Sequence, residues 1–145
     1  MQGNQVVFVD GVRTPFGRAG EKGMYWKTRA DDMIVSAIIG LLERNPSLPP
    51  ARIDEVAIAA TTQEGDQGLT LGRTAAILAG LPLSVPGFAI DRMCAGAMTA
   101  VTTLAGGIAA GAYDIALAGG VEHMGRPPLG RDIDLLNIAK LEDAK

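Results

Sequence analysis

Aromatic, cysteine and histidine residues are scarce in this sequence. Phe, Tyr and Trp together make up 4% of its 145 residues, and there is one cysteine and one histidine. A single cysteine excludes a disulfide bond within the chain, and one cysteine with one histidine argues against a zinc site. Residues 1–5 show no basic stretch leading into an apolar one, so we expect no secretory signal. We therefore expect a reduced, cytoplasmic protein that holds no metal ion.

An excess of positive charge is also missing. The chain has 13 Lys and Arg against 16 Asp and Glu, a net charge of −3, which gives no support to a nucleic-acid or anionic-membrane partner. Apolar residues make up 48%, as in globular proteins, and the length suits one domain. The uncharged run from Ala95 to Tyr113 is long enough to cross a bilayer, but it is mostly Ala, Gly and Thr. We expect it to form a buried helix followed by a buried strand.

Hydrophobic periodicity and turn residues predict strands and helices in alternation. Short apolar runs bounded by Gly, Pro or Asp predict strands at 5–10, 53–60, 87–91 and 113–118. Apolar spacing of three and four residues, with small-residue and turn signals, predicts helices at 29–44, 71–79, 94–110 and 135–145. This order predicts an α/β fold whose sheet has both faces covered.

Cys94 is the residue with the clearest chemical promise. It lies where the predicted strand 87–91 turns into the predicted helix 94–110, so the helix N-terminus favours its thiolate, the nucleophilic form. The small residues 95–97 leave room for a substrate carbonyl, and free N–H groups could receive its oxyanion. The alternative is a buried, inert cysteine. Nothing in the spacing shows that His123, the only histidine, reaches Cys94.

Several segments resemble thiolases. Residues 91–101, Asp-Arg-Met-Cys-Ala-Gly-Ala-Met-Thr-Ala-Val, resemble their active-site cysteine motif, which typically reads Asn-Arg-x-Cys-(Ser/Ala)-Ser-Gly-x-x-Ala-(Val/Ile). Other family segments are matched, in the same order, by residues 12–17, 72–76, 79–82 with 85–86, and 118–125. The last of these, Ala-Gly-Gly-Val-Glu-His-Met-Gly, is most similar to bacterial fatty-acid-oxidation 3-ketoacyl-CoA thiolases. We expect the resemblance to cover about residues 5 to 130 and to be poor from Asp132 to Lys145.

The resemblance implies a fold, a reaction and partners. It implies the N-terminal half of a layered thiolase fold with a mixed, mostly parallel sheet, in which residues 1–120 form an incomplete α/β domain and 121–145 begin a loop domain or a truncated tail. Cys94 would be the catalytic nucleophile that moves an acyl group between 3-ketoacyl-CoA and coenzyme A, or runs the reverse Claisen condensation. Coenzyme A is a substrate, no cofactor is implied, and cofactor-binding residues are not identified. A homo-oligomer, or a complex with a multienzyme subunit of β-oxidation, is expected.

The sequence departs from the thiolase pattern in two ways: residues of the cysteine motif differ, and two later motifs are missing. Asp91 stands where the family usually has Asn, and Ala95-Gly96-Ala97 replaces (Ser/Ala)-Ser-Gly. The Gly-His-Pro and Cys-x-Gly-Gly-Gly motifs of the later half do not occur, so we expect the 145-residue chain alone to be inactive. Two alternatives stay open: a related condensing enzyme such as a ketoacyl synthase, and a non-catalytic truncated relative or interaction module.

Other residues carry both a functional and a structural interpretation, and for most we favour the structural one. We expect a structural role for His123, a tight turn at Gly119-Gly120, and loop tethers rather than coenzyme A ligands at Arg13 and Arg73. We expect an exposed apolar patch, for a subunit contact or internal packing, at Met24, Tyr25 and Trp26. We expect solvated charges at Glu21, Lys22, Asp31 and Asp32.

Overall fold

The computed structural model describes residues 3–125 and confirms the α/β class. Its helices and strands are α1 (Ala30–Arg44), β1 (Glu55–Ala59), α2 (Leu71–Leu78), β2 (Gly87–Ile90), α3 (Gly96–Ala109) and β3 (Ala116–Gly120). Three short 3-10 turns join them: η1 (Pro50–Arg52), η2 (Gly65–Gln67) and η3 (Met93–Ala95). The predicted helix at 135–145 lies outside the described residues, and the division near residue 120 stays a prediction.

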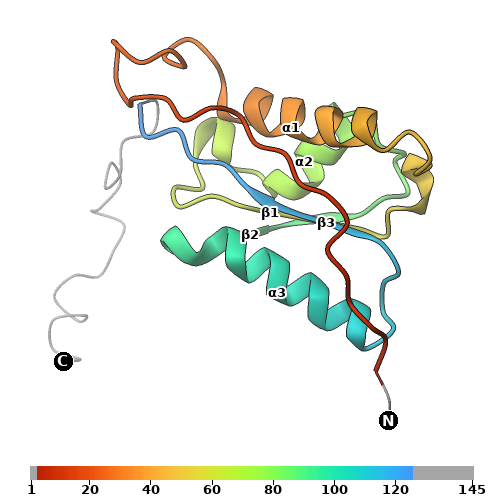
Figure 1. Cartoon of the computed structure of the whole chain (residues 1–145). Helices are drawn as coiled ribbons and strands as arrows, with labels where there is room; N and C mark the ends of the chain where they lie inside the picture. Colours follow the sequence, from red (N-terminus) through yellow and green to blue (C-terminus); the bar gives the residue numbers. More distant parts are fainter. Residues whose placement is uncertain (1–2, 126–145) are drawn as a thin grey trace, which may run out of the picture.

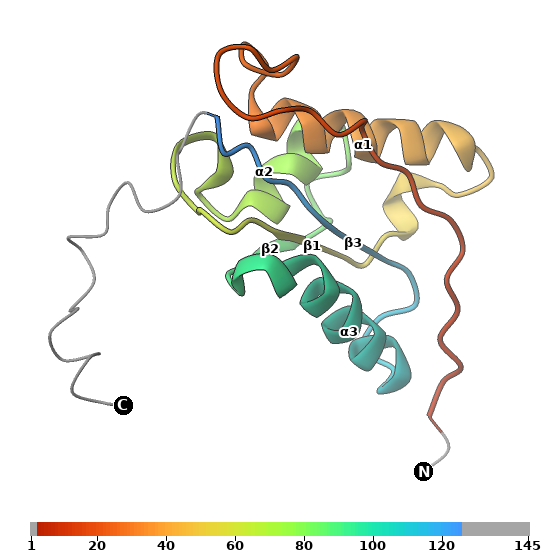
Figure 2. The ribbon, with the colours of Figure 1, turned by 60° about the vertical axis from the view of Figure 1, so that its left-hand side comes forward.

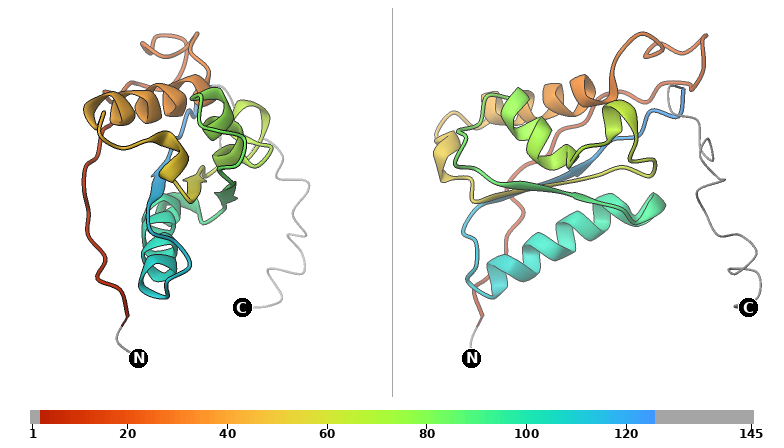
Figure 3. Two further views of the ribbon diagram at one scale, coloured as in Figure 1. Left: turned by 90° about the vertical axis from the view of Figure 1, so that its right-hand side faces the viewer. Right: turned by 180° about the vertical axis from the view of Figure 1, so that it is seen from behind.

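The three strands form one sheet in the order β2-β1-β3, and both neighbouring pairs are parallel. The mixed sheet that we expected needs an antiparallel strand, and residues 3–125 contain none. Helices α1 and α2 cover one face of the sheet and α3 covers the other (Figures 1 and 3). Because the strands are parallel, their carboxyl ends share one edge, and the loops that follow β1, β2 and β3 lie together there.

The main core lies between the sheet and the helices α1 and α2. Its buried side chains include Ile34 and Ile38 of α1, Val56 and Ile58 of β1, and Leu71 of α2. The apolar positions of α1 recur at helical spacing, and the helix ends before Asn45-Pro46, where the proline disfavours a further helical residue. A smaller core on the other face consists of Ala57, Ala100 and Leu104. Central strand β1 therefore contacts apolar side chains on both faces, as its continuous apolar run predicts.

The predicted strand at 5–10 is wrong. This segment is extended but belongs to no sheet among the described residues, and it runs on the outside of the molecule from the end of α3 to the end of α1 (Figure 2). Phe8 is 85% exposed, and Asp10 is held instead by Arg44 and Asn45 at the end of α1. A β-branched, aromatic run favours a strand only where a neighbouring strand completes its hydrogen bonds.

The strand predicted at 113–118 is observed at Ala116–Gly120, so it begins later and includes two glycines. Gly119 and Gly120 are the last residues of β3, paired with Ile58 and Ala59, and not a turn after the strand. A side chain at Gly120 would place its Cβ 3.1 Å from the Cβ of Ala97, so the missing side chain lets β3 and α3 approach closely. The uncharged run 95–113 contains α3, and no helix within residues 3–125 is both long and apolar enough to cross a bilayer.

Candidate active site around Cys94

Cys94 is exposed in the short η3 turn between β2 and α3. The preceding residue, Met93, has φ of 46°, a left-handed conformation that is uncommon outside glycine and is often found at functional sites. As the first residues of the turn, Met93 and Cys94 have no hydrogen-bond acceptor for their N–H groups within it. Cys94 is therefore not buried, contrary to that alternative, and it faces solvent in the η3 turn. Its reactivity stays a prediction.

The first turn of α3 packs directly on the ends of two strands. Gly96, the first residue of α3, is buried, and a side chain there would place its Cβ 2.7 Å from the Cβ of Ala59. Ala97 lies against Gly120 at the end of β3. The Ala95-Gly96-Ala97 run, a departure from the thiolase pattern, thus matches the local packing, because only glycine fits at position 96.

A polar cluster, which we call the Gln67–Glu122 clamp, lies at the same edge of the sheet, with Gln67 buried and Glu122 half-buried. Gln67 is 0% exposed, and its Nε2 donates to Glu122 Oε1 at 2.9 Å and to the Thr62 carbonyl at 2.7 Å. Gln67 Oε1 accepts from the His123 N–H at 2.6 Å, and Glu122 Oε2 accepts from the Thr61 N–H at 2.6 Å. The clamp ties the loop after β1 to the residues after β3. We did not predict it, because no local pattern marks a contact across 55 residues.

His123 fits the predicted structural role. Its side chain is buried, at 6% exposure for the residue, and Nε2 lies 2.6 Å from the Tyr25 carbonyl oxygen. A carbonyl only accepts, so Nε2 carries the proton and donates it there. His123 therefore ties the loop before α1 to the end of β3, and its Nε2 is not available to take a proton from Cys94.

Arg73 and Arg13, for which we expected loop tethers, make contacts of different kinds. The Arg73 guanidinium donates to the carbonyls of Leu83 and Val85, which holds the loop between α2 and β2. Arg13 donates to the Thr14 carbonyl and lies 4.8 Å from the centre of the Phe16 ring, an exposed and local contact. The contacts of Arg73 agree with the expected loop tether, whereas Arg13 contacts only its own loop among the described residues.

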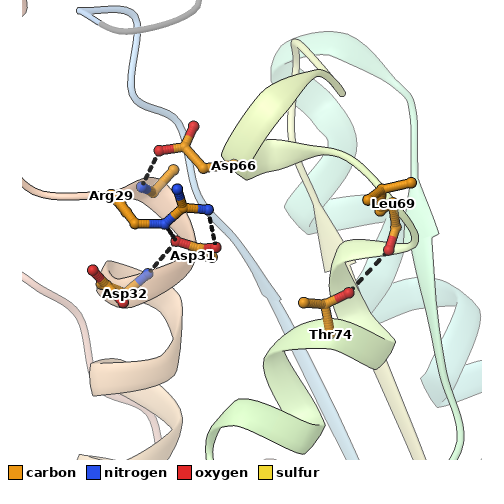
Figure 4. Close-up of polar contacts among 7 residues, drawn as sticks. Arg29, Asp31, Asp32, Asp66, Leu69 and Thr74 are labelled. Atoms are coloured by element: carbon orange, nitrogen blue, oxygen red, sulfur yellow. Dashed lines mark hydrogen bonds and ion pairs between the residues drawn. The ribbon is translucent and has the colours of Figure 1, made fainter.

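Asp31 is not the solvated charge that we expected. It is 8% exposed and forms an ion pair with Arg29 at 2.7 Å, shown in Figure 4. The hydrogen bonds from the Arg29 guanidinium hold the pKa of Asp31 below its ordinary value. In the same view Asp66 Oδ2 accepts from the Ala30 N–H at 3.1 Å, which joins the start of α1 to η2. Of the other predicted solvated charges, Glu21, Lys22 and Asp32 are exposed.

The remaining predicted features lie away from Cys94. Met24 and Trp26 are exposed, as expected of an apolar patch, while the Tyr25 hydroxyl donates to the Pro15 carbonyl. A cavity of about 530 Å³ lies between residues 8–19, α1 and β3, and Cys94 does not line it. Cys94 is exposed and lies outside this cavity.

The described residues thus form a parallel α/β sheet with an exposed cysteine just before α3, at the carboxyl ends of its strands. A family model described as "Thiolase, N-terminal domain" matches residues 6–145. The chain belongs to the thiolase family. The match extends to Lys145, beyond residue 130, where we expected the resemblance to end.

Relatives named 3-ketoacyl-CoA thiolase match most of the chain. It is 42% identical over 134 residues to that of Saccharophagus degradans, covering 92% of this chain and 34% of the relative. It is 43% identical over 126 residues to that of Pseudoalteromonas translucida, covering 87% and 32%. It is 40% identical over 140 residues to that of Aliivibrio salmonicida, covering 93% and 36%. The chain thus spans about a third of the length of the curated relatives it matches.

Proposed function

We propose that this chain is the nucleophile-bearing part of an acyl-CoA C-acyltransferase of the 3-ketoacyl-CoA thiolase type. The observation that carries the proposal is the exposed Cys94 in the η3 turn, directly before α3 and after a strained Met93. The names of the relatives supply the reaction. Coenzyme A and 3-ketoacyl-CoA are the substrates in this proposal.

In the proposed reaction the Cys94 thiolate attacks the 3-keto carbon of 3-ketoacyl-CoA. The N–H groups at the start of η3 donate to the oxygen that becomes negative. The bond between carbons 2 and 3 then breaks, and carbon 2 takes up a proton as acetyl-CoA leaves. The acyl group stays on Cys94 as a thioester. The thiol of free coenzyme A gives up its proton and attacks this thioester, which releases the shortened acyl-CoA and the Cys94 thiolate. The reverse sequence is a Claisen condensation.

Both half-reactions need a group that moves protons. His123 is the only histidine of the 145 residues, and its Nε2 already donates to the Tyr25 carbonyl. We therefore propose that these residues supply the nucleophile and that turnover needs a base and an acid from elsewhere. The 145-residue chain alone is expected not to turn over acetoacetyl-CoA.

The test is the rate at which iodoacetamide alkylates Cys94 at neutral pH. We expect the folded chain to react faster than a short unstructured peptide with the sequence of residues 91–97, because the fold places the thiol at a helix N-terminus. Equal rates would remove the support for an activated nucleophile. Thiolysis of acetoacetyl-CoA by the 145-residue chain, abolished by Cys94→Ser, would contradict the proposal that turnover needs further residues.

Two alternatives give different results. A ketoacyl-synthase-like enzyme uses an equivalent cysteine, but the Glu122-His123-Met124 segment and the names of the relatives favour the thiolase reaction. Acyl transfer from coenzyme A without decarboxylation of a malonyl group distinguishes the two. A non-catalytic interaction module would leave Cys94 no more reactive than the peptide.

We also propose that the protein assembles into a homo-oligomer. The outer face of α3 carries no charged residue and exposes Met98 and Val101, and Met24 and Trp26 are exposed near the start of α1. Apolar surface of this kind marks a contact with another protein surface. Sedimentation equilibrium tests the proposal, and a monomer at all concentrations would contradict it.

A further inference from the structure

We propose that Glu122 and Gln67 are positioning residues that hold the Cys94 turn in its reactive geometry. This inference rests on the proposed function, in which Cys94 is the nucleophile. Neither residue is placed in contact with the thiol. They act through the ends of β1 and β3, on which the first turn of α3 packs.

The clamp leaves no freedom in the orientation of the Gln67 amide. Its oxygen accepts from the His123 N–H, and its nitrogen donates to the Thr62 carbonyl and to Glu122. A flip of the amide would set its NH2 group against the His123 N–H. Glu122 faces two donors, the Thr61 N–H and the Gln67 NH2 group. The side chain at position 122 must therefore accept a hydrogen bond at each of its two terminal atoms. An ionised carboxylate does so, because both of its oxygens are acceptors.

The clamp is close in the chain to the residues that carry α3. Thr61 follows Ala59 by two residues, and Glu122 follows Gly120 by two residues. The Val121 N–H donates to the Ala59 carbonyl at 2.9 Å, so the two strand ends are already joined there. Gly96 packs on Ala59 within van der Waals contact. A shift of the strand ends therefore moves Ala59, on which Gly96 packs, and Gly96 lies two residues after Cys94.

The loop that carries Gln67 is also fixed from the other side. Asp66 caps the start of α1 through the Ala30 N–H, and the Thr74 hydroxyl donates to the Leu69 carbonyl at 3.0 Å, as Figure 4 shows. With both flanks anchored, the loop cannot move to repair a lost bond to Glu122. The loss is instead transmitted to the strand ends.

The first test is Glu122→Gln, which keeps the size of the side chain. In either orientation, the NH2 group of the new amide faces a donor, either the Thr61 N–H or the Gln67 NH2 group. We expect iodoacetamide to alkylate Cys94 about three- to tenfold more slowly, which corresponds to the loss of one ordinary hydrogen bond. We also expect the rate to rise at a higher pH than in the wild type, because the N–H groups near Cys94 are no longer held in place.

Asp54→Asn is the matched control. Asp54 Oδ2 accepts from the N–H groups of Asp114 at 2.8 Å and Ile115 at 3.0 Å, so it joins the same two strands at their other ends. This variant is expected to lower the urea midpoint while leaving both the rate and the pH profile of Cys94 alkylation unchanged. A general loss of stability would affect the two variants alike, whereas positioning affects Glu122→Gln alone.

The outcomes separate the two proposals. An activated wild-type Cys94 with an unchanged rate and pH profile in Glu122→Gln would overturn the clamp proposal and leave the proposed function standing. A wild-type rate equal to that of the peptide would contradict the proposed function itself. Should Glu122→Gln fail to fold, Glu122→Asp takes its place: the shorter carboxylate cannot reach both donors, so slower alkylation supports the proposal and an unchanged rate overturns it.

Discussion

Gly96 and Ala59 approach so closely that a Cβ added at Gly96 would lie 2.7 Å from the Cβ of Ala59. This contact joins the first residue of α3 to the last residue of β1. It sets how deeply the start of α3 sits on the sheet, and with it the place of Cys94 two residues earlier. The glycine is therefore a packing requirement of the candidate site.

The contact predicts opposite effects for two glycine substitutions in the same helix. Gly96→Ala forces α3 away from β1 and is expected to lower the free energy of unfolding by about 1–3 kcal/mol. Gly106→Ala is the control, since a Cβ there meets nothing within 4 Å, and it is expected to raise stability by up to about 1 kcal/mol. Urea unfolding followed by circular dichroism measures both. Equal effects of the two changes would contradict the packing argument.

Stability is also predicted to fall in acid. Hydrogen bonds from the Asn45 side chain, the Arg29 guanidinium, and the N–H groups of residues 115 and 114 hold the pKa values of Asp10, Asp31 and Asp54 below the ordinary range. The unfolded chain therefore binds more protons than the folded one in the window below about pH 4, the ordinary value. Stability from these groups is present above that pH and is lost as the pH falls through the lowered values.

The urea midpoint is accordingly expected to decrease between about pH 5 and about pH 3. Asp54→Asn removes one of the three lowered pKa values, so its midpoint is expected to depend less steeply on pH than that of the wild type. A midpoint that stays constant over this range in the wild type would contradict the linkage.

The sequence predicts those features that depend on neighbouring residues. The spacing of Ile34 and Ile38 predicts α1, and the place of Cys94 between a short strand and a run of small residues predicts its position before α3. Features that depend on residues far apart in the sequence were either not predicted or predicted wrongly. The 5–10 run has strand-forming residues but pairs with no strand among the described residues, and Gln67 meets Glu122 across 55 positions.

The two consecutive left-handed residues before α2 give a prediction about strain. Leu69 has φ of 52° and Thr70 has φ of 53°, although neither is glycine, and Leu69 is 90% exposed. A left-handed conformation costs a leucine roughly 1–2 kcal/mol, and Asn tolerates it better. Leu69→Asn is therefore expected to raise the free energy of unfolding by about 0.5–1 kcal/mol. Leu83→Asn, at another exposed leucine where no positive φ is found, is the control and is expected to have no such effect. A gain in both would point to removal of exposed apolar surface instead.

The last prediction separates the two roles weighed for Arg73 and Arg13. Arg73→Met leaves the carbonyls of Leu83 and Val85 without their charged donor, and Val85 is buried. We expect a loss of about 1.5–3 kcal/mol in the free energy of unfolding, the range for hydrogen bonds to charged groups. Arg13→Met removes only exposed local contacts and is expected to change stability by less than about 0.5 kcal/mol. If either arginine instead binds the phosphates of coenzyme A, its substitution weakens coenzyme A binding at unchanged stability. Isothermal titration alongside urea unfolding therefore assigns each arginine to one role, and unchanged stability in Arg73→Met would overturn the tether.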